Sequence, residues 1–296
     1  MANRIGVAPP RYRLPDATRI GRVKLQVGDL DKSIGYYQKV LGLEVREQSE
    51  GFASLAPKDE PDVILELKER RGVRPVPRRG LLGLYHFAVL LPDRPALGRF
   101  IFHLSEIGAR AGMSDHLVSE AVYLTDPDGL GIEVYADRPR ETWVVADRQL
   151  EMATKPLDVD NVVASAGGQK WDGMPRGTKI GHVHLHVGDL NEASDFYHAG
   201  LGLDKTVWGY PGALFMSAGG YHHHLGVNTW AVGSPVATDE DARLLDWELI
   251  VPDRTSRERA AQSLESGGVD VTHANGFIAA ADPWGIQVRL RSEDEG

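Results

Sequence analysis

Two histidines and one glutamate occupy matching places along the chain, and together they could hold a metal ion. His86 and His182 each lie on an apolar, strand-like segment, seven residues before an aspartate. Glu133 lies on another such segment, between the apolar residues Ile132 and Val134. A buried carboxylate is costly without a cation, and neutral imidazole is a good ligand for divalent metals. Each residue alone could be a core histidine or an arginine-paired acid, but their coincidence predicts a metal site.

The ligand set predicts the chemistry of this site. Two histidines and one carboxylate leave coordination positions open, which is typical of non-haem Fe(II) oxygenases, and Mn(II) accepts the same ligands. Neighbouring open positions suit a chelating diol together with O2. The chain contains no cysteine, so disulfides, thiolate metal sites, cysteine nucleophiles and iron–sulfur clusters are excluded.

The strand that carries His182 offers two further histidines. His182, His184 and His186 alternate and therefore share one face of a strand that rises ~3.3 Å per residue. Rings about 6.6 Å apart along the backbone cannot readily both make bonds of ~2.1 Å to one ion. Equivalence with His86 selects His182 as the ligand. His184 and His186 either line the site or are buried and hydrogen-bonded.

An internal repeat accounts for the matching histidines. The pattern I-G-x-V-x-L-x-V-G-D-L at 20–30 returns at 180–190, an offset of 160 residues. Each half divides again into a strand that ends in Asp, a helical stretch and further strand-like runs. We therefore expect four βαβββ modules, in two domains with a linker between them. The modules span 19–68, 84–136, 180–231 and 245–291, the domains 19–136 and 180–291, and the linker 137–179.

The first and fourth modules act as an internal control. At the places of the metal residues they carry Arg22, Asp246 and Arg289. Two arginines and one acid cannot hold a divalent cation, and Glu66 could complete a salt-bridged cluster with them. We therefore expect the second and third modules to pair around the metal, and the first and fourth to pair as a scaffold.

Length and charge restrict the classes of partner. The 296 residues suffice for about two domains of ~150 residues, with 42% hydrophobic and 25% charged residues as in ordinary globular proteins. A net charge of -9 disfavours nucleic acid. No signal-peptide core or run of 18 apolar residues occurs, so we expect a cytoplasmic protein that does not bind membranes. Exposed edge strands favour a homodimer.

Longer motifs carry a family resemblance. The pattern V-x-D-L, Y/F-Y and L-G-L, followed by DPDG-x-x-I-E, resembles the vicinal oxygen chelate superfamily, which includes glyoxalases and extradiol dioxygenases. The resemblance covers residues 19 to 291. It implies an α+β fold in which four βαβββ modules form two cup-shaped, mixed β-sheet half-barrels. Three segments together resemble the Bacillus-type catechol 2,3-dioxygenases: SDHLVSEAVYLTDPDGLGIEVYADRP, GHVHLHV and GGYHHHLGVNTW.

This resemblance implies roles for further residues. His223 corresponds to the acid–base histidine, with His222 as its structural neighbour. His116 and Tyr123 correspond to residues that hydrogen-bond the bound diol and oxygen. His184 and His222 are additional candidates for contact with substrate. The implied reaction is Fe(II)-dependent extradiol cleavage of catechol, or a substituted catechol, by O2 to a product of the 2-hydroxymuconic semialdehyde type.

Two other functions fit the same fold. One is a metal-dependent, glyoxalase-like lyase, which would use Zn or Ni and consume no oxygen. The other is a non-catalytic protein that sequesters an aromatic compound or an antibiotic. His223 and Tyr123 argue against both, because neither function needs them. We expect the aromatic residues Trp208, Phe215 and Trp230 to belong to the core rather than to flank a pocket.

Overall fold

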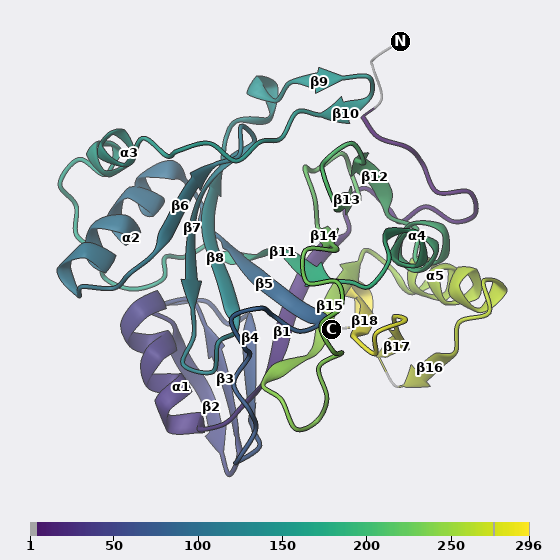
Figure 1. Ribbon diagram of the computed structural model, residues 1–296, viewed down its shortest axis with the longest axis horizontal. Coiled ribbons are helices and arrows are strands. Elements are labelled where there is room, and N and C mark those ends of the chain that lie inside the picture. The colour runs from purple at the N-terminus through teal and green to yellow at the C-terminus, as the bar shows by residue number, and fades with distance from the viewer. Residues whose placement is uncertain (1–4, 275, 296) are drawn as a thin grey trace.

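The computed structural model describes residues 5–274 and 276–295, which form four groups of strands, each with a helical segment after its first strand (Figure 1). The first module comprises β1 (Arg19–Val27), α1 (Leu30–Tyr36), the π-helical turn η1 (Tyr37–Leu41), β2 (Glu44–Ser49), β3 (Phe52–Ala56) and β4 (Leu65–Glu69). The second comprises β5 (Gly83–Leu90), α2 (Arg94–Glu106), β6 (Gly112–Asp115), β7 (Ser119–Thr125) and β8 (Gly131–Asp137). Both have the predicted βαβββ order.

The second half of the chain repeats this plan. The third module comprises β11 (Lys179–His186), α4 (Leu190–Ser194), the π-helical turn η3 (Asp195–Gly200), β12 (Asp204–Val207), β13 (Ala213–Ser217) and β14 (Leu225–Asn228). The fourth comprises β15 (Arg243–Val251), α5 (Arg254–Ser266), β16 (Val271–Ala274), β17 (Phe277–Ala281), β18 (Gln287–Ser292) and the 3-10 turn η4 (Glu293–Glu295). The predicted α+β fold with four modules is confirmed.

The four modules build two eight-stranded mixed sheets. One sheet has the order β12-β13-β14-β11-β5-β8-β7-β6 and so joins the third module to the second. The other has the order β16-β17-β18-β15-β1-β4-β3-β2 and joins the fourth module to the first. Antiparallel pairs β5–β11 and β1–β15 connect the modules at the middle of each sheet. The strand order confirms the predicted pairing. The second and third modules share the sheet that we call the inner sheet, and the first and fourth modules share the outer sheet.

The helix of each module begins directly after an aspartate that lies two or three residues beyond the first strand. The aspartate side chain accepts a hydrogen bond from a backbone N–H two or three residues later, which stabilises a helix N-terminus by ~1 kcal/mol. The four capping residues are Asp29, Asp93, Asp189 and Asp253. Within residues 5–274 and 276–295, no helix is both long and apolar enough to cross a membrane.

Hydrogen bonds between modules tie the two sheets together. The Tyr37 hydroxyl of the first module donates to Asp126 of the second at 3.0 Å. The duplicated pair, Tyr197 and Asp282, joins the third module to the fourth at 2.8 Å. Neighbouring modules are therefore linked by buried Tyr–Asp pairs although their strands belong to different sheets.

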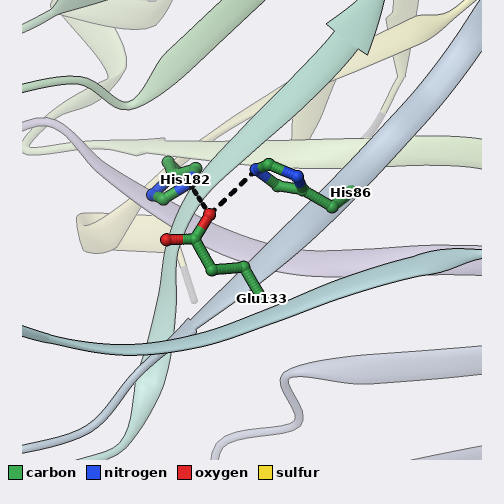
Figure 2. Close-up of side chains that lie close together, drawn as sticks. All are labelled: His86, Glu133 and His182. Atoms are coloured by element: carbon green, nitrogen blue, oxygen red, sulfur yellow. Dashed lines mark hydrogen bonds and ion pairs between the residues drawn. The ribbon is translucent and has the colours of Figure 1, made fainter. Parts of the chain in front are cut away.

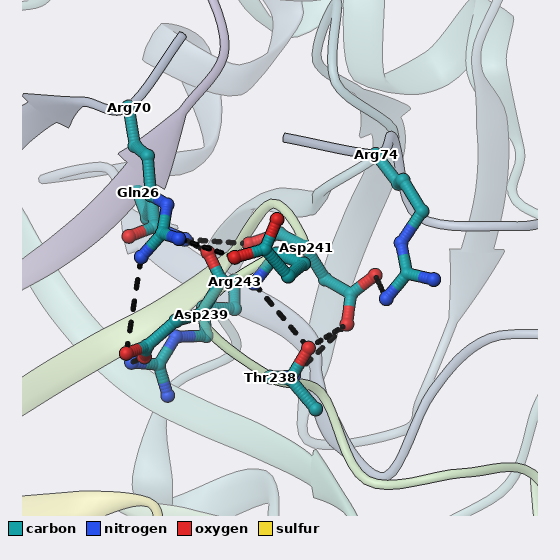
Figure 3. A network of polar contacts seen from close by, with 8 residues as sticks. Gln26, Arg70, Arg74, Thr238, Asp239, Asp241 and Arg243 are labelled. Atoms are coloured by element: carbon teal, nitrogen blue, oxygen red, sulfur yellow. Dashed lines mark hydrogen bonds and ion pairs between the residues drawn. The ribbon is translucent and has the colours of Figure 1, made fainter. Parts of the chain in front are cut away.

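A polar network fixes the loop between β14 and β15 to the first module (Figure 3). The buried Gln26 side chain donates to the backbone carbonyls of Asp239 and Asp241, both at 2.8 Å. Arg74 forms an ion pair with Asp241 at 2.8 Å, and Arg70 pairs with Glu240. The chain therefore passes from the inner sheet to the outer sheet along a fixed path.

The segment 137–179 is more ordered than a simple linker. It contains the turn η2 (Arg140–Thr142), the short hairpin β9 (Val145–Ala146) and β10 (Gln149–Leu150), and helix α3 (Val159–Ser165). Helix α3 packs against α2, where a Cβ on Gly98 would lie 2.3 Å from the carbonyl oxygen of Val162. Each sheet takes strands from both halves of the chain, so domain boundaries at 19–136 and 180–291 stay a prediction.

Candidate metal centre

Three neighbouring strands bring the predicted metal ligands together. His86 comes from β5, Glu133 from β8 and His182 from β11, and their side chains point toward one another (Figure 2). Glu133 Oε2 lies 3.0 Å from His86 Nε2 and 3.2 Å from His182 Nε2. One ligand atom from each residue lies within 4.8 Å of the other two. This spacing is compatible with three bonds of ~2.1 Å to a common ion.

Burial and the contacts among these residues give them the protonation states that a metal requires. Burial raises the pKa of Glu133, but His182 and His86 oppose this and hold the pKa well below its usual range. Burial lowers the pKa of His182 to about 4, against the opposing effect of Glu133. At neutral pH the site therefore offers an ionised carboxylate beside a neutral imidazole. Metal binding needs both forms.

An unsatisfied nitrogen supports the fit of a cation. Nε2 of His86 is fully enclosed and 3.0 Å from Glu133, yet it makes no hydrogen bond with the described residues. A buried polar atom without a partner costs about 1–3 kcal/mol. A divalent cation between the carboxylate and this lone pair would remove that cost.

A cavity of about 220 Å³ opens beside the metal ligands. It is larger than the ~150 Å³ apolar cavity that accommodates benzene, so a single aromatic ring fits. Its walls combine aromatic rings with a few polar groups: Tyr85, His86, Ser114, His116, Ser119, Tyr123, Glu133, Met152, Ala153, Thr154, His184, Tyr210, Phe215, His223 and Trp230.

His116 and Tyr123 form a hydrogen-bonded pair in this cavity. His116 Nδ1 lies 2.8 Å from the carbonyl oxygen of Ala153, which can only accept, so Nδ1 carries a proton. In the neutral ring Nε2 is then an acceptor, and the Tyr123 hydroxyl donates to it at 2.5 Å. Burial, and after it the charge of Glu133, raises the pKa of Tyr123 well above its ordinary value, so the hydroxyl keeps its proton.

His222 and His223 form a second hydrogen-bonded pair. His222 Nε2 lies 2.9 Å from a carboxylate oxygen of Asp137, at the end of β8. An ionised carboxylate only accepts, so Nε2 carries a proton and, in the neutral ring, Nδ1 is an acceptor. His223 Nδ1 lies 2.7 Å from that atom and therefore donates to it. This leaves Nε2 of His223 as an unprotonated lone pair on a residue that lines the cavity.

The other two histidines of β11 differ in position. His184 lines the cavity and His186 is buried outside its walls. Both hydrogen-bond to the side chain of Asn228 on β14, at 2.9 and 2.7 Å. Of the two alternatives left open by the sequence, His184 satisfies both and His186 is a buried, hydrogen-bonded residue.

The outer sheet carries salt bridges at the positions of the metal ligands. Arg22 pairs with Glu66 at 2.8 Å and with Asp246 at 2.9 Å, as expected. Arg289 does not join this cluster, contrary to the expectation: it makes no ion pair with Glu66 or Asp246, and its guanidinium lies 3.7 Å from the ring centroid of Phe277. Within the described residues, the candidate three-ligand group is the one in the inner sheet.

The expectation that the large aromatic residues belong to the core was right for Phe215, a member of a buried cluster, and wrong for Trp208 and Trp230. Phe215 is buried but lines the cavity, and Trp230 lines it with 49% of its surface exposed. Trp208 is 39% exposed and lies outside both the core and the cavity walls. Rings at the mouth of a pocket keep one face in solvent, which sequence composition alone cannot indicate.

Asp137 and Asn228 were missed by sequence reasoning. A weak signal existed for both, because each is a polar residue that ends an apolar strand. That signal does not show which histidine each residue contacts, since the pairs are separated by 85 and 44 residues.

Comparisons with known proteins identify the family of the chain. A family model described as the Glyoxalase/Bleomycin resistance protein/Dioxygenase superfamily matches residues 19–134. A Bacillus subtilis (strain 168) protein named catechol-2,3-dioxygenase is 41% identical over 271 residues, covering 90% of this chain and 94% of that protein.

Solved structures show the same fold. A protein of Bacillus subtilis subsp. subtilis str. 168 has a TM-score of 0.65 at 15% identity, over 96% of this chain and 87% of that one. Glyoxalase I from Zea mays has a TM-score of 0.54 at 18% identity, over 94% of each chain. Together with the sequence matches, these findings show that the chain belongs to the glyoxalase/bleomycin resistance protein/dioxygenase superfamily.

Proposed function

We propose that the protein is an Fe(II)-dependent extradiol dioxygenase that cleaves catechol or a substituted catechol with O2. The observation that carries this proposal is the convergence of His86, Glu133 and His182 beside a cavity that also contains the free Nε2 of His223. The relative named catechol-2,3-dioxygenase supports the substrate class.

The ligands assigned to Fe(II) are His86, Glu133 and His182. When bound there, Fe(II) would lower the pKa of a chelated phenol and hold the diol and O2 side by side. Mn(II) is the alternative ion, because the same ligands accept it.

His223 is the proposed general base. Its Nδ1 proton is held by His222, so its Nε2 can accept the phenolic proton of a diol in the cavity and return it later. Burial, and then neighbouring histidines, lower the pKa of His223 well below its ordinary value. The ring is therefore neutral before substrate enters, as a base must be.

Tyr123 and His116 are the proposed hydrogen-bonding residues for the reacting oxygens. The Tyr123 hydroxyl already has His116 as acceptor. A proton placed on His116 Nε2 would reverse this bond, so the pair can hold a proton at either end. Such donors stabilise negative charge on oxygen in a water-poor site.

Two variants test the proposal. Glu133→Ala is expected to lose bound iron and turnover, because a buried carboxylate ligand is removed. His223→Ala is expected to keep iron but lose roughly 100-fold or more in kcat, the usual contribution of a general base. Iron per chain, O2 uptake and formation of a yellow ring-fission product are measured. Retention of iron by Glu133→Ala would refute the ligand assignment.

The same measurements separate the other two functions. Anaerobic protein is reconstituted with Fe(II), Mn(II), Zn(II) or Ni(II), and then given catechol and air. A glyoxalase-like lyase would consume no O2 with any ion, and a sequestering protein would bind catechol without product. We expect one O2 to be consumed for each ring opened when the protein contains Fe(II) or Mn(II), and no O2 uptake when it contains Zn(II) or Ni(II).

A further inference from the structure

The buried side chain of Asn228 has one possible orientation. Its Oδ1 lies 3.0 Å from the backbone N–H of Trp230, and that N–H can only donate. The same oxygen lies 2.7 Å from His186 Nδ1. The amide oxygen is thus fixed by the backbone, and the NH2 group must face His184.

This orientation fixes the protonation of His184. The Asn228 NH2 group lies 2.9 Å from His184 Nε2, and an NH2 group only donates. Nε2 therefore carries a lone pair, and the proton of the neutral ring lies on Nδ1. A protonated Nδ1 cannot ligate a cation, which leaves His182 as the metal ligand of β11.

The Nδ1–H of His184 is left without a partner on a residue that lines the cavity. Nδ1 has no hydrogen-bond partner within residues 5–274 and 276–295, and it is not fully enclosed. The ring is held over Gly226, where a Cβ would lie 2.9 Å from Cγ of His184.

The position of His184 indicates which part of a ligand this N–H meets. Its ring lies 5.0 Å from that of His86, and 5.2 and 5.7 Å from those of Tyr85 and Trp230. Trp230 is 49% exposed and marks the mouth of the cavity, whereas the Tyr85 ring also lies 4.7 Å from that of His86. His184 therefore lies between His86 and Trp230, beside the part of a chelated ring that is distant from its diol.

We propose that Asn228 is a positioning residue that holds His184 in its Nδ1–H form, and that this N–H binds an acceptor oxygen on the ring substituent of an aromatic diol. The second half rests on the proposed function, and the first half does not. The site would thus favour catechols with a carbonyl-type substituent over catechols with an alkyl substituent of similar size.

NMR of the metal-free full chain, with ¹⁵N-labelled histidine, tests the first half. His184 is expected to show a proton on Nδ1 and none on Nε2. The matched variant is Asn228→Asp, because a carboxylate still accepts from Trp230 and His186 but cannot donate to His184. In this variant Nε2 is expected to become protonated. A proton on His184 Nε2 in the wild type would overturn the assignment.

Binding to the Zn(II)-loaded chain tests the second half. The probes are 3- and 4-methylcatechol and 2,3- and 3,4-dihydroxybenzaldehyde. The wild type is expected to prefer an aldehyde, and His184→Phe to weaken its binding about 3- to 10-fold while changing the methylcatechols less than twofold. Phe215→Leu, the control, should weaken all four alike.

The outcomes separate this inference from the proposed function. Equal weakening of both probe classes by His184→Phe, or no change in either, would overturn the substituent contact. If no catechol binds the Zn(II)-loaded wild type, the proposed function and the substituent contact both fail. The NMR result would still decide the role of Asn228.

Discussion

At the scale of single residues, the site is defined by groups that can play one hydrogen-bonding role only. The Ala153 carbonyl and the Asp137 carboxylate accept, and the Trp230 backbone N–H donates. Each determines which nitrogen of a nearby histidine carries the proton. Of the histidines oriented in this way, His223 consequently offers a free lone pair and His184 a free N–H on the cavity wall.

The contact between His222 and His223 leads to a prediction for turnover. In His222→Phe the Nδ1 proton of His223 loses its acceptor, so the proton is free to occupy Nε2, the proposed base. We expect kcat to fall about 10- to 100-fold with iron per chain unchanged. O2 uptake and iron analysis measure this.

His224→Asn is the control for that prediction. It keeps an acceptor for the Ala218 backbone N–H, which His224 Nδ1 now accepts at 3.2 Å. Its kcat should stay within about twofold of wild type. Loss of iron in His222→Phe, or an unchanged kcat, would contradict the proposal that His222 holds the Nδ1 proton of His223.

At the scale of elements, the first strands of the first and third modules approach neighbouring side chains closely at equivalent positions of the repeat, Gly21 and Gly181. Gly181 on β11 lies under the hydroxyl of Tyr135, where a Cβ would be 1.8 Å from Oη. That hydroxyl bonds to Tyr221, which in turn donates to Asp137. The glycine in β11 therefore leaves room for Tyr135, which through Tyr221 holds the Asp137 carboxylate that His222 contacts.

The duplicated glycine provides a matched pair for testing this contact. Gly181→Ala forces the rigid, buried Tyr135 ring to move and should lower the free energy of unfolding by about 1–3 kcal/mol, as overpacking does. At Gly21 a Cβ would meet the side chain of Glu248, which can swing aside, so Gly21→Ala should cost less. Denaturant unfolding at one pH compares them, and equal losses would contradict this account.

At the scale of the whole molecule, the two sheets are joined through acids buried between modules. Burial raises the pKa of Asp126 and of Asp282 to about 6, despite backbone N–H and tyrosine donors. At pH 5 each of these two acids is thus mostly protonated in the folded chain and mostly ionised in the unfolded chain. Their contribution to the free energy of unfolding is complete below about pH 4 and is lost as the pH rises through 6.

Asp126→Asn tests this pH dependence. The amide can accept the bonds from Asp128 and Leu130 and donate to Tyr37, while it carries no charge. A rise in pKa from 3.8 to about 6 corresponds to roughly 3 kcal/mol. The free energy of unfolding of the variant should therefore exceed that of the wild type by up to this amount at pH 7.5. The difference should vanish near pH 4. A pH-independent difference in unfolding free energy would contradict the prediction.

The homodimer also belongs to this scale and stays a prediction. The strands β2, β6, β12 and β16 lie at the ends of the two sheets. Backbone bridges from Asp115 to Lys155 and from Lys205 to Val7 already cover part of β6 and β12, so β2 and β16 are the edges to which a second chain would more readily add.

The sequence by itself determined the four modules, their pairing and the aspartates that begin the helices, and it predicted the three candidate metal ligands that the fold brings together. These features are local or periodic: strand alternation, capping aspartates and a 160-residue repeat that places His182 where Arg22 stands in the first module. The arginine that replaces a candidate metal ligand at the equivalent position of the repeat can be recognised from the sequence alone.

Only the tertiary structure decided which nitrogen of each histidine carries its proton and which aromatic rings line the cavity. The partners of His116, His184 and His222 lie 37, 44 and 85 residues away in the chain. No periodicity relates such residues, because contacts across a curved sheet depend on how strands from different modules meet. The candidate metal ligands could therefore be predicted from the residues, and the family resemblance pointed to His223, but the sequence could not show which nitrogen of His223 or of His184 carries the proton.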